Sequence, residues 1–228
     1  MLILGIDTSG KSGGITLAEG DAKSFRAVGS RPIEGGTFSA QLVPTIAALL
    51  EQHRRTAQDL GGFAAASGPG SFTGLRVGLS AVKGLAEVLN KPIATVSLLE
   101  ALAISSGQQG RIAAALDAGR SEIFWGVYQV SADNGHKISE ELLSREEFLR
   151  HLGSSELDFV IVGDVALGDL ASAVTDKARL QLAPRPGSEV IAQIGLRKIV
   201  AGETVSVETL DANYIRRSDA EIFAKDRS

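Results

Sequence analysis

The chain has 228 residues, of which 44% are hydrophobic, enough for one large domain or two smaller lobes with cores of their own. Lys and Arg number 23 against 27 Asp and Glu, and this net charge of −4 argues against tight nucleic-acid binding by the chain alone. The absence of cysteine excludes disulfides, thiol nucleophiles and thiolate metal sites. The apolar start is interrupted at Asp7 and has no basic region before it, so we expect no signal peptide and no membrane span. We expect a soluble, cytoplasmic protein.

The first elements along the chain follow a strand–turn–strand pattern. The apolar run Leu2–Ile6 is stopped by a polar turn that begins at Asp7, and a second apolar strand follows. The same pattern returns far downstream, where Ile112–Leu116 is followed by Asp117 and by a strand rich in aromatic and β-branched residues. This faint duplication predicts two related lobes, which we divide into residues 1–105 and 106–228.

Two helices are expected between these hairpins. The first covers about Thr37–His53, and the second begins in or just after the glycine-rich segment Gly68–Gly74 and ends near Leu89. The second helix is apolar on two faces, so both faces must be buried. Gly74 and Gly78 would let another element approach closely, at a cost of about 1 kcal/mol each in helix stability. Burial in a large core and contact with a partner chain both explain this pattern.

The two Asp turns admit two interpretations. In sugar kinases, actin and Hsp70 chaperones, two such hairpins hold ATP phosphates through backbone N–H groups and an Asp directed at Mg²⁺. Alternatively each Asp only ends its strand by bonding its own turn, and spacing alone favours this interpretation. The glycine-rich segment matches neither the P-loop nor the dinucleotide fingerprint, and a tight turn packed against another chain explains it better. The candidate phosphate-binding residues, as remnants of such a grip, are Asp7, Thr8, Ser9, Asp117 and Gly119.

No constellation for catalysis or metal binding is evident. His53, His136 and His151 are far apart, no pair has ligand spacing, and cysteine is absent, so we expect no metal site. Ser71 has no histidine near it in sequence and directly follows Gly70, which does not fit the Gly-x-Ser-x-Gly nucleophile motif. We therefore assign no catalytic residue.

Taken together, these segments resemble the TsaB (YeaZ) family. The strongest match is the unbroken string GPGSFTGLRVG at Gly68–Gly78, supported by Leu4–Thr8 at the start and Leu116–Ala118 in the second hairpin. The likeness extends in order over essentially the whole chain. It departs from the family at Phe38, where His is frequent, and at Gly119, where Arg is usual, which puts in doubt any role for an arginine in that turn.

The resemblance implies an α/β, two-lobed fold of the actin/Hsp70/sugar-kinase (ASKHA, ribonuclease H-like) type, and kinship with TsaD, a transferase with paired metal-binding histidines that this chain lacks. It implies a non-catalytic subunit for threonylcarbamoyl-adenosine modification of tRNA, which supports TsaD together with the ATPase TsaE. The implied protein has no cofactor, binds ATP or ADP weakly or not at all, forms a homodimer when alone and meets tRNA only within the complex. A metallo-endopeptidase and an ATP-dependent small-molecule kinase of the same fold are the alternatives.

The family forms its dimers through the two helices described above, and this resemblance favours a partner interface over simple core burial. The residues expected at that interface are Phe38, Leu42, Ile46, Ser71, Phe72, Gly74, Leu75, Gly78, Leu79 and Val82.

Overall fold

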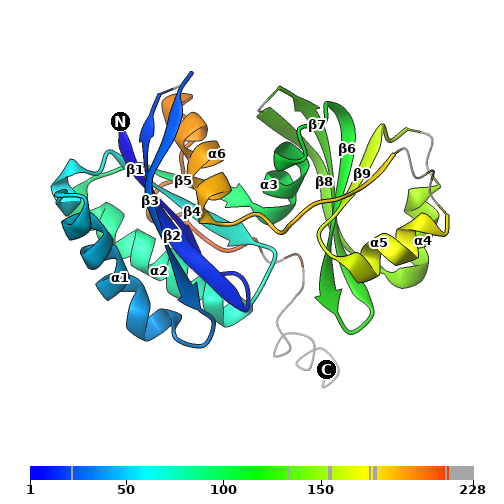
Figure 1. Cartoon of the computed structure of the whole chain (residues 1–228), viewed down its shortest axis with the longest axis horizontal. Coiled ribbons are helices and arrows are strands. Elements are labelled where there is room, and N and C mark those ends of the chain that lie inside the picture. The colour runs from blue at the N-terminus through cyan, green and yellow to red at the C-terminus, as the bar shows by residue number, and fades with distance from the viewer. Residues whose placement is uncertain are drawn as a thin grey trace. The chain divides into compact units, whose positions relative to one another are not determined.

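Two five-stranded sheets organise the computed structural model of the chain (Figure 1). The structure describes residues 1–21, 23–132, 134–153, 156–174, 176, 179–213 and 215. The chain forms two units, one made of Met1–Ser97 with Pro186–Asn213 and the other containing Leu98–Arg185. Each unit holds one sheet and its own hydrophobic core.

The sheet of the first unit has the strand order β3-β2-β1-β4-β5. Its strands are β1 (Leu2–Asp7), β2 (Ser12–Gly20), β3 (Phe25–Glu34), β4 (Gly62–Gly68) and β5 (Ile93–Ser97). The first three strands are antiparallel to one another, whereas β4 pairs parallel with both β1 and β5. Figure 1 shows the helices α1 (Phe38–Gln52) and α2 (Phe72–Leu89) on one face of this sheet and α6 (Ser188–Val200) on the other, and the 3-10 turn η1 (Ala57–Asp59) follows α1.

Alternating apolar side chains of β1 and β2 form a core with α1 and α2, because successive residues of a strand point to opposite faces. The first helix expected from the sequence is confirmed as α1, and it buries an apolar stripe at helical spacing, Phe38, Leu42, Ile46, Leu49 and Leu50. Pro44 lies inside α1 and is exposed. The main side chains of this core are Leu4, Ile6, Ile15, Leu17, Leu42, Ile46, Leu49, Phe63, Leu79 and Val82.

The opposite face of the first sheet is closed by α6, which comes from far along the chain. A β-carbon at Gly5 would lie 2.6 Å from Ala192 Cβ, so the helix and the strand touch backbone to backbone. Ser188, which the sequence favours as the N-cap of this helix, is instead its first residue, with Gly187 as the N-cap. The Ser188 hydroxyl lies 2.8 Å from Thr16 Oγ1, to which it is hydrogen-bonded.

The sheet of the second unit has the order β8-β7-β6-β9-β10. Its strands are β6 (Gly110–Gly119), β7 (Glu122–Ser131), β8 (Asn134–Ser144), β9 (Phe159–Val162) and β10 (Leu180–Leu182). Its helices are α3 (Leu98–Ser105), α4 (Arg145–Leu152) and α5 (Val165–Ser172). Ser144 and Glu147 have the sequence spacing of a capping box, and the start of α4 confirms it. Ser144 Oγ accepts a hydrogen bond from Glu147 N at 3.2 Å, and the Glu147 carboxylate accepts one from Ser144 N at 2.8 Å.

The two sheets have the same topology, because an antiparallel hairpin is followed in each by a third antiparallel strand and two parallel strands. The duplication predicted from the Asp7 and Asp117 hairpins is therefore confirmed. The division differs from the expected one at residue 105. The helix α3 packs on the second sheet, and α6 packs on the first, so residues 186–213 belong to the first unit.

Among the described residues, no helix is long and apolar enough to cross a membrane.

Candidate functional site

The polar turn after β1 directs its side chains at its own chain. Asp7 Oδ1 accepts hydrogen bonds from the Ser9 N–H at 2.9 Å and from the Ser9 hydroxyl, as in an Asx turn. Thr8 Oγ1 donates to the Gly74 carbonyl at 2.7 Å. Only 3% of Asp7, 3% of Thr8 and 1% of Ser9 remain exposed, so a phosphate could reach these groups only if the turn were displaced.

The glycines of the GPGSFTGLRVG string allow the Asp7 turn to lie against α2. A β-carbon at Gly74 would collide with the Thr8 carbonyl oxygen, and one at Gly78 with the Thr8 hydroxyl. A β-carbon at Gly70 would similarly collide with Ser9. The Ser71 N–H also donates to the Ser9 carbonyl at 2.7 Å. The string therefore packs against the first hairpin of the same chain, and the prediction that it packs against another chain is wrong for these glycines.

The same glycine-rich segment determines where α2 begins. Ser71 is the N-cap residue, and its hydroxyl accepts a hydrogen bond from the Gly74 N–H at 3.2 Å. The helix ends at Asn90, which adopts a left-handed conformation with φ of 51°. The start and the end expected from the sequence are thus confirmed.

The residues expected at a partner interface lie mostly inside the first unit. Eight of the ten are buried, and only Ser71 and Phe72 keep substantial exposure. Gly78, which was expected at the interface, faces Thr8 of the same chain. These inward positions hold α1 and α2 on the sheet, and most of them are out of reach of another protein while the unit is folded. They are Phe38, Leu42, Ile46, Gly74, Leu75, Gly78, Leu79 and Val82.

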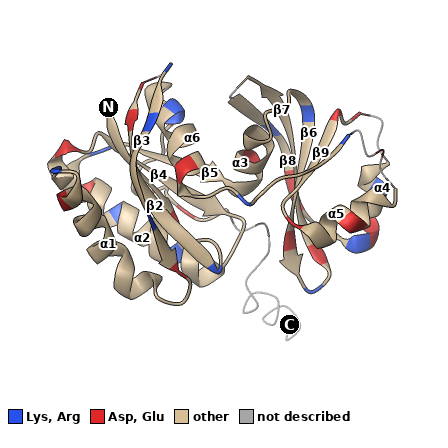
Figure 2. Ribbon diagram, viewed as in Figure 1, with Lys and Arg blue, Asp and Glu red and all other residues tan. Residues whose placement is uncertain are grey.

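The outward side of α1 is mainly small and apolar, whereas α2 exposes Arg76 and Glu87 beside its small and apolar residues. The sequence of α1 contains no charged residue before Glu51, so most of its water-facing side has none (Figure 2). Val43 is 57% exposed and Val88, on α2, is 84% exposed. A β-carbon at Gly84 would meet nothing within 4 Å. We define the outer helix face as Ala40, Val43, Pro44, Ala47, Ser80, Gly84 and Val88.

A cavity of about 410 Å³ lies where the N-terminal ends of α1 and α2 meet the β1–β2 turn. Phe38 and Val77 contribute apolar walls, and Lys11 contributes a positive charge at its exposed edge. The side chain of Arg76, in the first turns of α2, stacks on Phe72 with its guanidinium carbon 3.7 Å from the ring centre, a cation–π contact.

The second Asp turn lies in the second unit and repeats the local geometry of the first. Asp117 Oδ1 accepts a hydrogen bond from the Gly119 N–H at 2.9 Å, and Gly119 has a φ of 70°. Asp117 is exposed, in contrast to Asp7. In both turns the Asp carboxylate therefore bonds the backbone of its own turn, as the interpretation of a strand-ending Asp predicts, although β6 continues past Asp117 to Gly119. In the described part of the chain, no group of three or more His, Asp or Glu residues is placed to hold a metal ion.

Comparison with known proteins agrees with this architecture. A family model described as TsaD, tRNA N6-adenosine threonylcarbamoyltransferase, matches residues 35–157. The tRNA threonylcarbamoyladenosine biosynthesis protein TsaB of Bacillus subtilis is 30% identical over 97% of this chain and 96% of its own length. The protein of the same name from Escherichia coli is 29% identical over 79% of this chain and 81% of its own. A crystal structure from Pseudomonas aeruginosa, described as similar to the peptidase YeaZ, superposes with a TM-score of 0.77 at 26% identity, covering 94% of this chain and 99% of that one.

The fold and these matches define a two-lobed protein of the actin/Hsp70/sugar-kinase class that is related to the TsaD transferases. Within that class, the chain belongs to the TsaB (YeaZ) family, whose members are named for tRNA threonylcarbamoyladenosine biosynthesis. The resemblance carried by Gly68–Gly78 and by the two Asp turns is thereby confirmed.

Proposed function

We propose that the chain is a non-catalytic cytoplasmic subunit for threonylcarbamoyl-adenosine modification of tRNA, which binds and supports a TsaD-like transferase together with a TsaE-like ATPase. The observation that carries this proposal is the outer helix face. The solvent side of a surface helix normally carries charged and polar residues, yet α1 exposes mainly small and apolar ones. Exposed apolar patches of this kind mark protein–protein contacts. Membership in the TsaB family supports tRNA threonylcarbamoyladenosine biosynthesis as the pathway in which this partner acts.

The small side chains of the outer helix face suit a helix-to-helix contact. Ala40 and Ala47 on α1, with Gly84 on α2, leave room for the backbone of another helix. Two such helix pairs would form a four-helix contact around a two-fold or pseudo-two-fold axis. The same face would join two copies when the chain is alone, and the transferase would replace one copy in the working complex.

The geometry of the Asp7 turn supports a role without nucleotide chemistry. The Asp7 carboxylate and the Thr8 hydroxyl both bond to groups of the same chain, and both residues are buried. A phosphate or Mg²⁺ would have to break these bonds and displace α2 before it could bind. We therefore propose that ATP and ADP bind weakly or not at all and that the acyl-transfer chemistry belongs to the partner.

The test of the interface is the double variant Val43→Glu/Val88→Glu. Both positions are exposed, so the fold should survive, but two carboxylates in an apolar contact would be buried without partners. We expect affinity for the transferase, and self-association, to fall at least about a hundredfold, roughly 2.7 kcal/mol. The control is Val165→Glu, at the start of α5 in the second unit, where a 62% exposed valine receives one such charge. Unchanged assembly of the folded double variant would place the interface elsewhere.

The test of the biological role is nucleoside mass spectrometry of tRNA from a strain that lacks this protein. We expect threonylcarbamoyl-adenosine to be lost, while synthesis of threonylcarbamoyl-AMP continues. The Val165→Glu variant should restore the modified nucleoside, and Val43→Glu/Val88→Glu should not. Intact modification in the deletion strain, with no second gene copy, would refute the assignment.

A further inference from the structure

Four arginines lie on two neighbouring segments at the edge of the first sheet. Arg26 and Arg31 lie on the edge strand β3, and Arg54 and Arg55 follow the C-terminal end of α1. Arg31 pairs with Ile15 across the β2–β3 ladder, and Ile15 is buried in the core beneath the helices, so Arg31 lies on the face that α1 covers. We call these four residues the arginine stripe.

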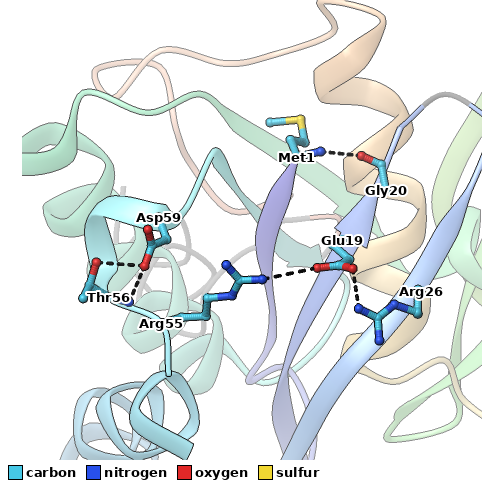
Figure 3. Close-up of polar contacts among 7 residues, drawn as sticks. All are labelled: Met1, Glu19, Gly20, Arg26, Arg55, Thr56 and Asp59. Carbon is cyan, nitrogen blue, oxygen red and sulfur yellow. Dashed lines mark hydrogen bonds and ion pairs between the residues drawn. The ribbon is translucent and has the colours of Figure 1, made fainter. Parts of the chain in front are cut away.

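A carboxylate joins the strand and helix parts of the arginine stripe. Glu19 forms an ion pair with Arg26, which lies opposite it on β3, and a second one with Arg55 at 3.7 Å (Figure 3). The hydrogen bond from Arg26 holds the pKa of Glu19 below its ordinary value of 4.5, so this carboxylate is ionised at neutral pH. The Glu19 carboxylate holds both guanidinium groups in place, while the side chain of Arg26 remains 68% exposed and that of Arg55 remains 45% exposed. Each guanidinium has five N–H donors, so donors are left for a ligand.

The other two arginines keep their charge unneutralised. Arg31 and Arg54 are exposed and form no ion pair within the part of the chain that the structure describes. Two more carboxylates lie close by in sequence, Glu51 in the last turn of α1 and Asp59 in η1. The Asp59 carboxylate is already engaged by the Thr56 N–H at 2.7 Å and the Thr56 hydroxyl at 3.0 Å (Figure 3). Against Glu19, Glu51 and Asp59 the arginine stripe holds four arginines, an excess of one positive charge among these seven residues.

The two units differ in net charge. The first, residues 1–97 with 186–213, carries 11 Lys and Arg against 11 Asp and Glu, whereas residues 98–185 carry 8 against 13. The acidity of the chain thus arises in the second unit, and a polyanion meets less repulsion at the neutral first unit. The stripe is built of arginine alone, and the planar guanidinium fork matches a phosphate group with two parallel hydrogen bonds.

We propose that the arginine stripe contacts the phosphate backbone of tRNA when the chain is assembled with its transferase, an inference that rests on the proposed function. Phosphate contacts of this kind position a nucleic acid without reading its sequence. The net charge of −4 keeps the affinity of the isolated chain low, and the stripe adds its contacts to those that the partner makes.

The experiment uses the assembled complex and an unmodified tRNA transcript as the probe. The triple variant Arg26→Gln/Arg31→Gln/Arg54→Gln leaves the Glu19–Arg55 ion pair in place. If three phosphate contacts are lost, the slope of log affinity against log salt should become shallower by about 2 to 3, and affinity at low salt should fall at least about tenfold. The matched control, Lys137→Gln/Arg145→Gln/Arg150→Gln, removes the same formal charge from exposed positions of the second unit and should change the slope far less.

Assembly with the transferase is measured separately on the same proteins. If the wild-type chain does not assemble, the proposed function fails, whatever the RNA result. If the triple variant assembles normally but its tRNA affinity and salt slope equal those of the control variant, the inference about the arginine stripe is wrong. If the triple variant loses assembly and the control does not, the stripe binds an acidic surface of the partner protein, which also overturns the inference.

Discussion

Replacing Gly78 with alanine should destabilise the first unit, although alanine is the better helix former. A Gly→Ala change inside a helix stabilises it by about 0.5–1 kcal/mol when the new methyl group has space. At Gly78 the methyl group would collide with the Thr8 hydroxyl, and overpacking of this kind costs about 1–3 kcal/mol. Gly84→Ala is the matched control in α2, because nothing lies within 4 Å of its new methyl group. We expect Gly84→Ala to stabilise the protein and Gly78→Ala to be less stable than Gly84→Ala by about 1–3 kcal/mol.

A double-mutant cycle with Thr8 isolates the cause. Thr8→Ala removes the colliding oxygen, and of that side chain only Cβ, 3.4 Å from the new methyl group, would remain close to position 78. Gly78→Ala should then lose its penalty, which gives a coupling energy of about 1–3 kcal/mol. Urea unfolding of the single and double variants measures these differences, at several protein concentrations because self-association raises apparent stability. Equal stabilisation by Gly78→Ala and Gly84→Ala, or zero coupling with Thr8, would refute the packing argument.

Two further predictions concern ligand and pH. Addition of 1 mM Mg-ATP should leave the thermal unfolding midpoint unchanged, because the Asp7 turn is closed. If ATP bound with a dissociation constant near 1 μM, 1 mM ATP would instead raise the free energy of unfolding by about 4.1 kcal/mol, which thermal unfolding would detect. The urea midpoint should fall as the pH is lowered from about 5 to 3. Hydrogen bonds lower the pKa of five surface carboxyls below their ordinary 3.8 or 4.5. The stability that these carboxyls contribute is present above those values and is lost as pH falls through the folded-state pKa. A midpoint that stayed constant or rose on acidification would contradict this assignment. The five carboxyls are Glu19, Asp21, Asp59, Glu147 and Glu208.

Local patterns in the sequence were sufficient for most of the elements. The two hairpins follow from short apolar runs ended by an Asp turn, and α4 follows from its capping box at Ser144 and Glu147. The end of α2 follows from Asn90, which tolerates the left-handed conformation that closes the helix. Each of these features depends on residues within a few positions of one another, so the chain order alone contains the information.

The sequence could not say which apolar stripe of α2 faces inward. Helical spacing gives one stripe through Leu75, Leu79 and Val82 and another through Gly84 and Val88, and both have the same period. The structure buries the first and exposes the second, because the larger side chains fill the space above the sheet. The expected interface residues therefore lie mostly on the side of α1 and α2 that packs on the sheet.

Contacts between distant segments were also outside the reach of local patterns. The need for glycine at position 78 comes from Thr8, seventy residues earlier, and nothing in the helix itself reveals it. The packing of α6 on the first sheet likewise joins Ala192 to Gly5. The boundary expected at residue 105 did not take into account that the chain returns to the first sheet through α6.

The return of α6 to the first sheet has a consequence for biosynthesis. Residues 98–185 are inserted between the two segments that form the first unit, so a ribosome completes that unit only after it has made most of the chain. Until α6 emerges, one face of the first sheet, including Ile3, Ala64 and Ala94, has no cover. An uncovered apolar face makes a nascent chain prone to aggregate. A fragment that stops at residue 105 would carry this defect permanently, whereas one that contains residues 98–185 would include the whole second sheet.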